Sequence, residues 1–119
     1  RTPFTQGLFD YPRMQLIQKD ALLVNVGRGT MIVTRDLEKL LAEGHFSGVV
    51  LDVMDPEPLP ESSTLWSCER VLLTPHISGI GFDHEPATER FIWDLCRENL
   101  RRYAAGDPLA HVVDVAAGY

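Results

Sequence analysis

Residues 21–29 have the sequence Ala-Leu-Leu-Val-Asn-Val-Gly-Arg-Gly, a mostly apolar run that ends in an arginine between two glycines. Two further apolar runs, at residues 48–51 and 71–73, also lead into polar motifs. Short apolar runs of this kind are typical of buried strands. Because ligands of open α/β sheets bind outside the carboxyl ends of parallel strands, we expect Arg28, Glu57 and His76 to converge at one sheet edge.

Helical patterns alternate with these runs. Asp10 and Thr34 are candidate N-caps for the first two helices, because short polar side chains satisfy the free N–H groups there. Strands alternating with helices predict parallel βαβ units. The fold class is therefore α/β: the later half of a Rossmann-type doubly wound parallel sheet, truncated and lacking the GxGxxG turn. We predict helices over 11–17, 35–42 and about 85–105, and strands over 21–26, 48–51 and 71–73.

Composition and charge narrow the class of protein. The chain has 119 residues, of which 45% are hydrophobic, and its eleven Lys+Arg against seventeen Asp+Glu give a net charge of −6. An acidic chain without a basic stripe is not expected to bind nucleic acid. No apolar run approaches the ~20 residues that a membrane span needs, and no signal peptide is expected.

The cysteines and histidines predict no metal site. Cys68 and Cys96 do not form a CxxC pair, and we expect Cys96 to be a buried free thiol on the apolar face of the last helix. Free thiols suit a cytoplasmic protein. His45, His84 and His111 are scattered without the spacing of metal ligands.

The motifs resemble those of the D-isomer-specific 2-hydroxyacid dehydrogenases, in their C-terminal part. Separated motifs in the family's order carry the resemblance over nearly the whole chain: Thr2–Leu8, Leu23–Gly29, Leu51–Val53, Glu57–Pro60 and Thr74–His76. The closing Val113-Asp114 and Gly118-Tyr119 are similar to the glyoxylate/hydroxypyruvate reductase branch. One departure is Thr34-Arg35, which replaces an acidic pair and should affect helix capping more than chemistry.

The resemblance implies an NAD- or NADP-dependent enzyme that reduces a small 2-keto acid, such as glyoxylate or hydroxypyruvate, to the D-2-hydroxy acid. It implies that Arg28 grips the substrate carboxylate and keto oxygen. His76 would be the general acid/base, and Glu57 the acid that pairs with it. The resemblance further implies a cytoplasmic homodimer when intact.

The resemblance also implies a set of residues near the cofactor. Asp52 would meet the nicotinamide carboxamide, and the backbone of Val26 and Gly27 would lie against the nicotinamide ribose. Ser78 and Gly79 would lie beside the nicotinamide ring. Arg28 and His76 would border the cofactor as well as the substrate.

Two alternatives stay open. A corepressor branch of the family retains the same triad, so the protein could be a non-catalytic NAD sensor or scaffold. Because the sequence has no GxGxxG turn, the chain could also be an inactive fragment. A test of dinucleotide binding separates these hypotheses.

We expect the chain to be part of a larger protein. Residues 1–105 would be the C-terminal part of a dinucleotide-binding domain, and residues 106–119 a tail that returns toward a substrate domain absent here. Parallel sheets need cover on both faces, and three strands with these helices leave one face bare. We therefore expect the chain by itself to aggregate, to swap domains or to bind a partner.

Overall fold

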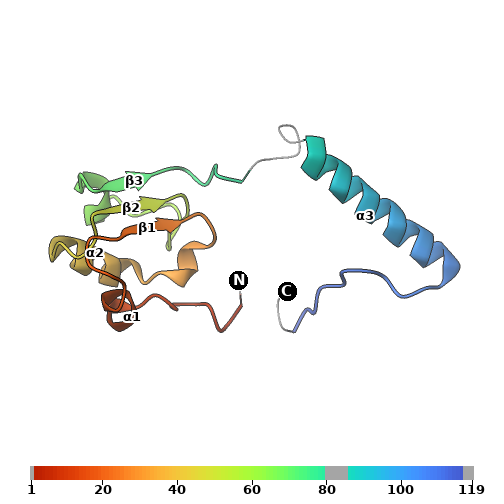
Figure 1. Cartoon of the computed structure of the whole chain (residues 1–119), viewed down its shortest axis with the longest axis horizontal. Coiled ribbons are helices and arrows are strands. Elements are labelled where there is room, and N and C mark those ends of the chain that lie inside the picture. Colours follow the sequence, from red (N-terminus) through yellow and green to blue (C-terminus); the bar gives the residue numbers. More distant parts are fainter. Residues whose placement is uncertain (1, 80–85, 117–119) are drawn as a thin grey trace. The chain divides into compact units, whose positions relative to one another are not determined.

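The computed structural model describes residues 2–79 and 86–116. The chain divides into two compact units, Arg1–Ser78 and Gly79–Tyr119. The first unit contains the sheet and the second a long helix with the tail that follows it (Figure 1). The assignment of residues 1–105 to one domain stays a prediction.

The sheet has three parallel strands in the order β1-β2-β3. β1 spans Leu22–Asn25, β2 spans Gly48–Leu51 and β3 spans Val71–Leu73. In the register of the sheet, Leu51 lies between Asn25 and Leu73. The prediction of three adjacent parallel strands is confirmed, and the polar motifs follow their carboxyl ends (Figure 1).

One short helix precedes these strands and another connects the first two. α1 spans Tyr11–Gln15, and the Asp10 side chain caps it by accepting a hydrogen bond from the Arg13 N–H at 3.1 Å. α2 spans Thr34–Ala42 and lies between β1 and β2 along the chain. Two 3-10 turns, η1 at Gly29–Met31 and η2 at Thr64–Ser67, complete the first unit.

One face of the sheet is packed against α1 and α2. α1 contributes Met14, which is fully buried, and α2 contributes the stripe predicted from its leucine spacing. Residues in the strands alternate between this core and the opposite face, because successive side chains of a strand point to opposite sides. The buried core consists of Met14, Ile32, Leu37, Leu40, Leu41, Phe46, Val49, Leu51, Leu59 and Leu65.

The prediction that Thr34 caps α2 is wrong. The helix begins at Thr34 itself, and the residue in the cap position is Val33, which makes no side-chain cap bond. The Thr34 hydroxyl instead donates a hydrogen bond to the Asp55 carbonyl at 2.6 Å. Thr34 therefore ties the start of α2 to the proline-rich loop after β2.

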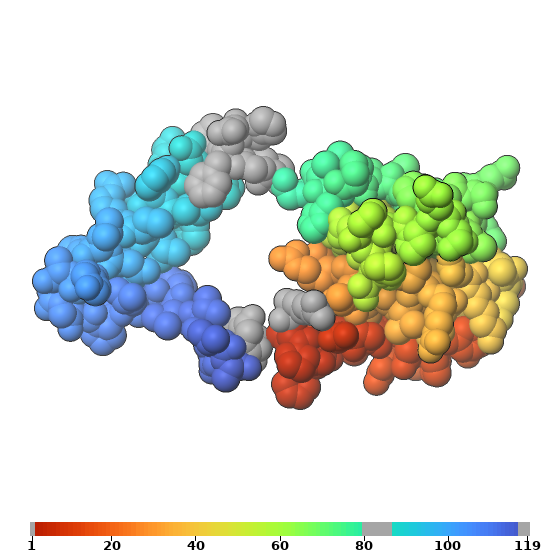
Figure 2. All heavy atoms as spheres, turned by 180° about the vertical axis from the view of Figure 1, so that it is seen from behind, coloured from red at the N-terminus to blue at the C-terminus, as the bar shows by residue number. Residues whose placement is uncertain are grey.

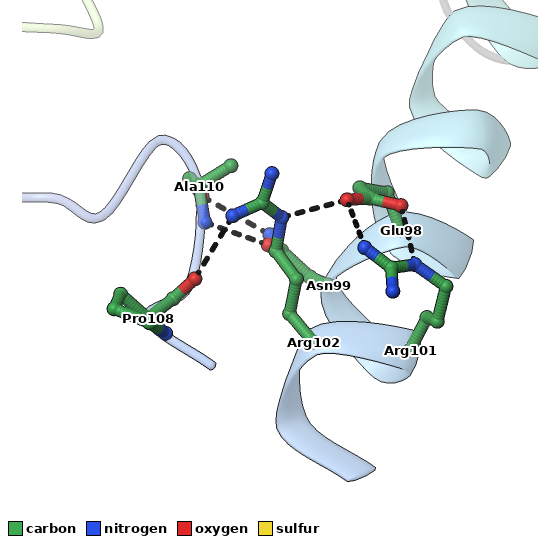
Figure 3. Close-up of polar contacts among 6 residues, drawn as sticks. All are labelled: Glu98, Asn99, Arg101, Arg102, Pro108 and Ala110. Atoms are coloured by element: carbon green, nitrogen blue, oxygen red, sulfur yellow. Dashed lines mark hydrogen bonds and ion pairs between the residues drawn. The ribbon is translucent and has the colours of Figure 1, made fainter. Parts of the chain in front are cut away.

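In the second unit, the tail folds back on the end of α3, which spans Pro86–Ala105 (Figures 1 and 2). The Asn99 side chain donates to the Ala110 carbonyl at 3.1 Å and accepts from the Ala110 N–H at 2.9 Å. Arg102 donates to the Pro108 carbonyl and to Glu98 (Figure 3). Bonds from Arg101 and Arg102 lower the pKa of Glu98 to about 2. The start of the tail is thus fixed by side chains of α3.

The prediction of a buried Cys96 is wrong, because its side chain is exposed. Helical spacing placed it on an apolar face, but Phe91 and Tyr103 on that face are exposed, and Ile92 and Leu95 are only half-buried within the described residues. The predicted helix start at Glu85, like His84, lies outside the described residues. None of the described helices is long and apolar enough to cross a membrane.

The second face of the sheet is apolar and uncovered by any element of the first unit. Leu22, Val24 and Leu72 point to this face and are 63%, 53% and 57% exposed. Val24 and Leu72 flank Val50 in one row across the three strands. Contiguous apolar surface of this kind favours association.

We therefore expect the 119-residue chain, expressed alone, to self-associate. The double variant V24T/L72T should shift it toward monomer, because it replaces two exposed apolar side chains on this face while β-branched threonine suits a strand. Light scattering at several concentrations measures the effect. A monodisperse monomer of the unsubstituted chain would contradict the expectation.

Candidate active site

The carboxyl edge of the sheet brings a histidine and a glutamate into contact. The distance between His76 Nδ1 and Glu57 Oε1 is 3.0 Å, although the two residues come from the loops after β3 and β2. Their side chains are 52% and 38% exposed. A carboxylate on one ring nitrogen fixes the tautomer and the orientation of an imidazole. The pair is therefore suited to proton transfer at the other ring nitrogen.

The second ring nitrogen of His76 is available for that transfer. Nε2 has no hydrogen-bond partner among the described residues. The backbone of His76 has φ +56°, in the left-handed region, and its N–H donates to the Thr74 carbonyl at 3.0 Å. A non-glycine residue in this conformation requires support from its surroundings. The support comes from the bonds that Asp52 makes to the residues on both sides of His76.

Asp52 lies at the end of β2 with 1% of its surface exposed. Its carboxylate accepts hydrogen bonds from the Thr74 hydroxyl, the Ile77 N–H at 2.9 Å, and the N–H and hydroxyl of Ser78 at 2.9 and 2.7 Å. The Thr74 hydroxyl and the two Ser78 groups hold the pKa of Asp52 well below its usual range, against the effect of burial. The buried group is thus an ionised carboxylate.

Arg28 follows β1 at the same edge and is exposed. Its guanidinium donates to the Gly27 carbonyl at 2.8 Å, and within the described residues it makes no contact with Glu57 or His76. The structure thus brings together the glutamate and the histidine of the predicted set, and places Arg28 on the neighbouring loop.

Asn25 holds the loop that carries Arg28. Asn25 is 9% exposed, its amide donates to the Arg28 carbonyl at 3.1 Å, and its Oδ1 accepts from the Gly27 N–H at 3.1 Å. Asn25 lies within the predicted strand 21–26, and no role in the site is predicted for it. A polar residue at the last position of an apolar strand was the signal that could have identified it.

Gly29 fixes the distance between the Arg28 loop and the loop of Glu57. A Cβ atom on Gly29 would lie 1.9 Å from the carbonyl oxygen of Met54. Only a residue without a side chain permits this backbone approach. The segment from Gly27 to Gly29 is therefore held between Asn25 and Met54.

The remaining predicted cofactor positions surround this edge. Val26, Gly27, Ser78 and Gly79 are exposed. A cavity of about 250 Å³ lies beside Glu57 and is mainly apolar, lined by Met54, Pro58, Leu59, Trp66, Leu73, Thr74 and Pro75. Exposed glycines leave room for a flat ring to approach the backbone. Their exposure leaves these positions accessible to a cofactor, whereas a GxGxxG phosphate turn is absent from this sequence.

These features define a Rossmann-like dinucleotide-binding domain with a histidine–glutamate pair at its carboxyl edge. Residues 1–78 match the NAD binding domain of the D-isomer specific 2-hydroxyacid dehydrogenases. The chain belongs to this family. The prediction of NAD or NADP as the cofactor is confirmed, because the matched domain is an NAD binding domain.

Relatives and solved structures agree with this assignment. A glyoxylate/hydroxypyruvate reductase A of Photorhabdus laumondii is 32% identical over 118 residues, covering 99% of this chain and 36% of the relative. A D-isomer specific 2-hydroxyacid dehydrogenase of Xanthobacter autotrophicus, solved with NADPH and MES, is 37% identical with a TM-score of 0.85, covering 100% of this chain and 47% of that one. The chain thus spans less than half the length of these proteins.

An NADPH-dependent glyoxylate/hydroxypyruvate reductase of Sinorhizobium meliloti, solved with NADP and sulfate, has a TM-score of 0.80 at 31% identity. The match covers 100% of this chain and 37% of the Sinorhizobium protein. The predicted fold class and family are therefore confirmed. The roles predicted for individual site residues stay predictions.

We expect Gly29→Ala to destabilise the protein by about 1–3 kcal/mol, because the new Cβ forces the backbones of Gly29 and Met54 apart. Gly27→Ala is the matched control, since its nearest neighbour outside the adjoining residues is 3.6 Å away. Urea unfolding of the two variants measures the difference. Equal stabilities would show that the contact between Gly29 and Met54 is unimportant.

Proposed function

We propose that this chain provides the catalytic dyad and the nicotinamide side of an enzyme that reduces a small 2-keto acid, such as glyoxylate or hydroxypyruvate, to the D-2-hydroxy acid. The observation that carries the proposal is the 3.0 Å contact between His76 Nδ1 and Glu57 Oε1, together with the unpartnered Nε2. The names of the relatives support the substrate class. We keep a cytoplasmic homodimer as the predicted state of the intact protein.

Arg28 binds and orients the substrate in this proposal. A guanidinium presents a planar fork of donors that matches a carboxylate, and it keeps its charge at every physiological pH. The exposed Arg28 would engage the carboxylate and keto oxygen, which polarises the carbonyl group. Asn25 holds the loop that carries Arg28 through two hydrogen bonds, so the backbone from which the guanidinium extends is fixed.

His76 supplies the proton. When the keto carbon accepts hydride from the bound nicotinamide, negative charge develops on the oxygen. The imidazolium of His76 donates its Nε2 proton to that oxygen, and Glu57 on Nδ1 balances the positive charge before the transfer. Ser78 and Gly79 lie next to His76 along the chain and would border the nicotinamide ring.

We expect Arg28→Ala and His76→Ala to have different kinetic effects in the protein expressed from its full native reading frame. H76A should lower kcat for glyoxylate reduction by about 10²–10⁴-fold and change NADPH affinity little, because it removes only the proton donor. R28A should mainly raise KM and lower kcat as well, because it removes binding and polarisation together.

Steady-state kinetics with His111→Ala, an exposed histidine in the tail, is the control for these variants. If H76A kept wild-type kcat, the proposed role of His76 would be wrong. Binding of NADPH without turnover by the unsubstituted protein would support the alternative of a nucleotide sensor.

We expect Glu57→Gln to change the pH dependence of reduction. Reduction consumes the imidazolium, and an amide stabilises it less than a carboxylate does. The kcat/KM of E57Q should therefore fall at a lower pH than that of the wild type as pH rises. Profiles of kcat/KM between pH 5 and 10 test this, and superimposable profiles would mean that Glu57 does not act through His76.

A further inference from the structure

The loop that carries Glu57 cannot be held by a ladder of its own backbone hydrogen bonds. It runs from Asp55 to Pro60, and every second residue from Pro56 onward is a proline, which has no N–H to donate. Leu59, which is 5% exposed, anchors the second half of the loop in the core. The position of Glu57 therefore depends on side chains that reach the loop from other elements.

Two such side chains bond the two ends of the loop. At the first end, the Thr34 hydroxyl donates to the Asp55 carbonyl at 2.6 Å. At the second end, the indole Nε1–H of Trp66 donates to the Pro60 carbonyl at 2.9 Å. Glu57 lies between these two contacts along the chain. The loop is therefore held on both sides of the glutamate of the dyad.

Both contacts depend on helix α2. Thr34 is its first residue and Glu38 follows four residues later, so the two side chains lie on the same side of the helix. Glu38 accepts hydrogen bonds from the Ser63 hydroxyl at 2.6 Å and from the Thr64 N–H at 3.0 Å. These bonds hold η2, which carries Trp66. Because the leucines of α2 pack in the core, the loop is anchored to a fixed helix.

The dyad cannot hold the loop by itself. The side chains of His76 and Glu57 are 52% and 38% exposed, and an ion pair in contact with water contributes little free energy. The loop must therefore be positioned by other contacts before the two side chains can meet. The bonds from Thr34 and Trp66 supply such contacts.

We propose that Thr34 and Trp66 are positioning residues for the dyad: their hydrogen bonds to the ends of the loop keep Glu57 Oε1 within reach of His76 Nδ1. The catalytic consequence of this inference rests on the proposed function. The polar atom of each residue bonds a backbone carbonyl of the loop, so both residues act through Glu57. Trp66 also lines the cavity beside Glu57.

The test removes one hydrogen bond at a time in the protein expressed from its full native reading frame. Thr34→Val deletes the hydroxyl at nearly constant volume, whereas Thr34→Ser keeps it. Trp66→Phe deletes the N–H and keeps an aromatic ring, and the double variant T34V/W66F removes both contacts. Trp93→Phe is the matched control, because Trp93 is exposed on α3 and its indole donates to Glu89 of the same helix.

Three quantities are measured for each variant: the ¹⁵N shift of His76 Nδ1, kcat with KM for glyoxylate, and the free energy of unfolding in urea. The signal that disappears in H76A identifies His76 in the spectrum. E57Q gives the shift of a ring that has lost the carboxylate. The shift is recorded on folded protein, so it separates a displaced Glu57 from a general loss of stability.

We expect T34V and W66F to move the Nδ1 shift part of the way toward that of E57Q, and the double variant to move it further. kcat should fall by about 3–10-fold in each single variant and by up to about 10²-fold in the double variant, since small misplacements have effects of this size. KM should stay within about threefold of wild type, because substrate binding is assigned to Arg28 on a separate loop. T34S and W93F should match the wild type.

A folded double variant with the wild-type Nδ1 shift would overturn the proposal, because the two bonds would then not determine where Glu57 lies. A change in W93F as large as that in W66F would overturn it as well. If the double variant does not fold, T34V and W66F decide by the same criterion. The shift needs no turnover, so an inactive wild-type protein would count against the proposed function and leave the role of Thr34 and Trp66 to be decided by the shift.

Discussion

A buried charge must be fully hydrogen-bonded, and in this chain that requirement decides where the candidate site lies. Asp52 is an ionised carboxylate at the end of the central strand, and its partners come from a segment more than twenty residues away along the chain. An uncompensated carboxylate at this depth would cost far more than the ordering of a loop. The segment 74–78 after β3 therefore lies against the end of β2, which places His76 beside Glu57.

Asn25 and Asp52 each hold one loop at the carboxyl edge of the sheet. Asn25, at the end of β1, bonds backbone groups of the Arg28 loop, and Asp52 does the same for the His76 loop. The Arg28 loop follows β1 and the His76 loop follows β3, and both strands pair in parallel with β2, so the two loops leave the sheet at the same edge. The chemistry of the edge thus depends on residues that do not themselves reach the solvent.

The strands could be predicted from the sequence because apolar periodicity is a local property. The pairing of Glu57 with His76 was implied by the family resemblance, and the shared carboxyl edge of parallel strands predicted only that the two residues converge. The uncovered face of the sheet followed from counting strands and helices. The roles of Thr34 and Gly29 could not be predicted, since each depends on a contact with a residue distant in sequence. The burial of Cys96 was mispredicted because spacing defines the face of a helix but says nothing of what covers it.

Water reaches the contact between Glu57 and His76, and this affects the strength of the contact. Water around Glu57 and His76 screens their attraction, so the pair is weakly coupled while the edge of the sheet is open. Any surface that covers the edge excludes this water and lowers the local dielectric, which strengthens the same 3.0 Å contact without moving either side chain. Under the proposed function, the surface that encloses the substrate would therefore also strengthen the contact that orients the His76 ring.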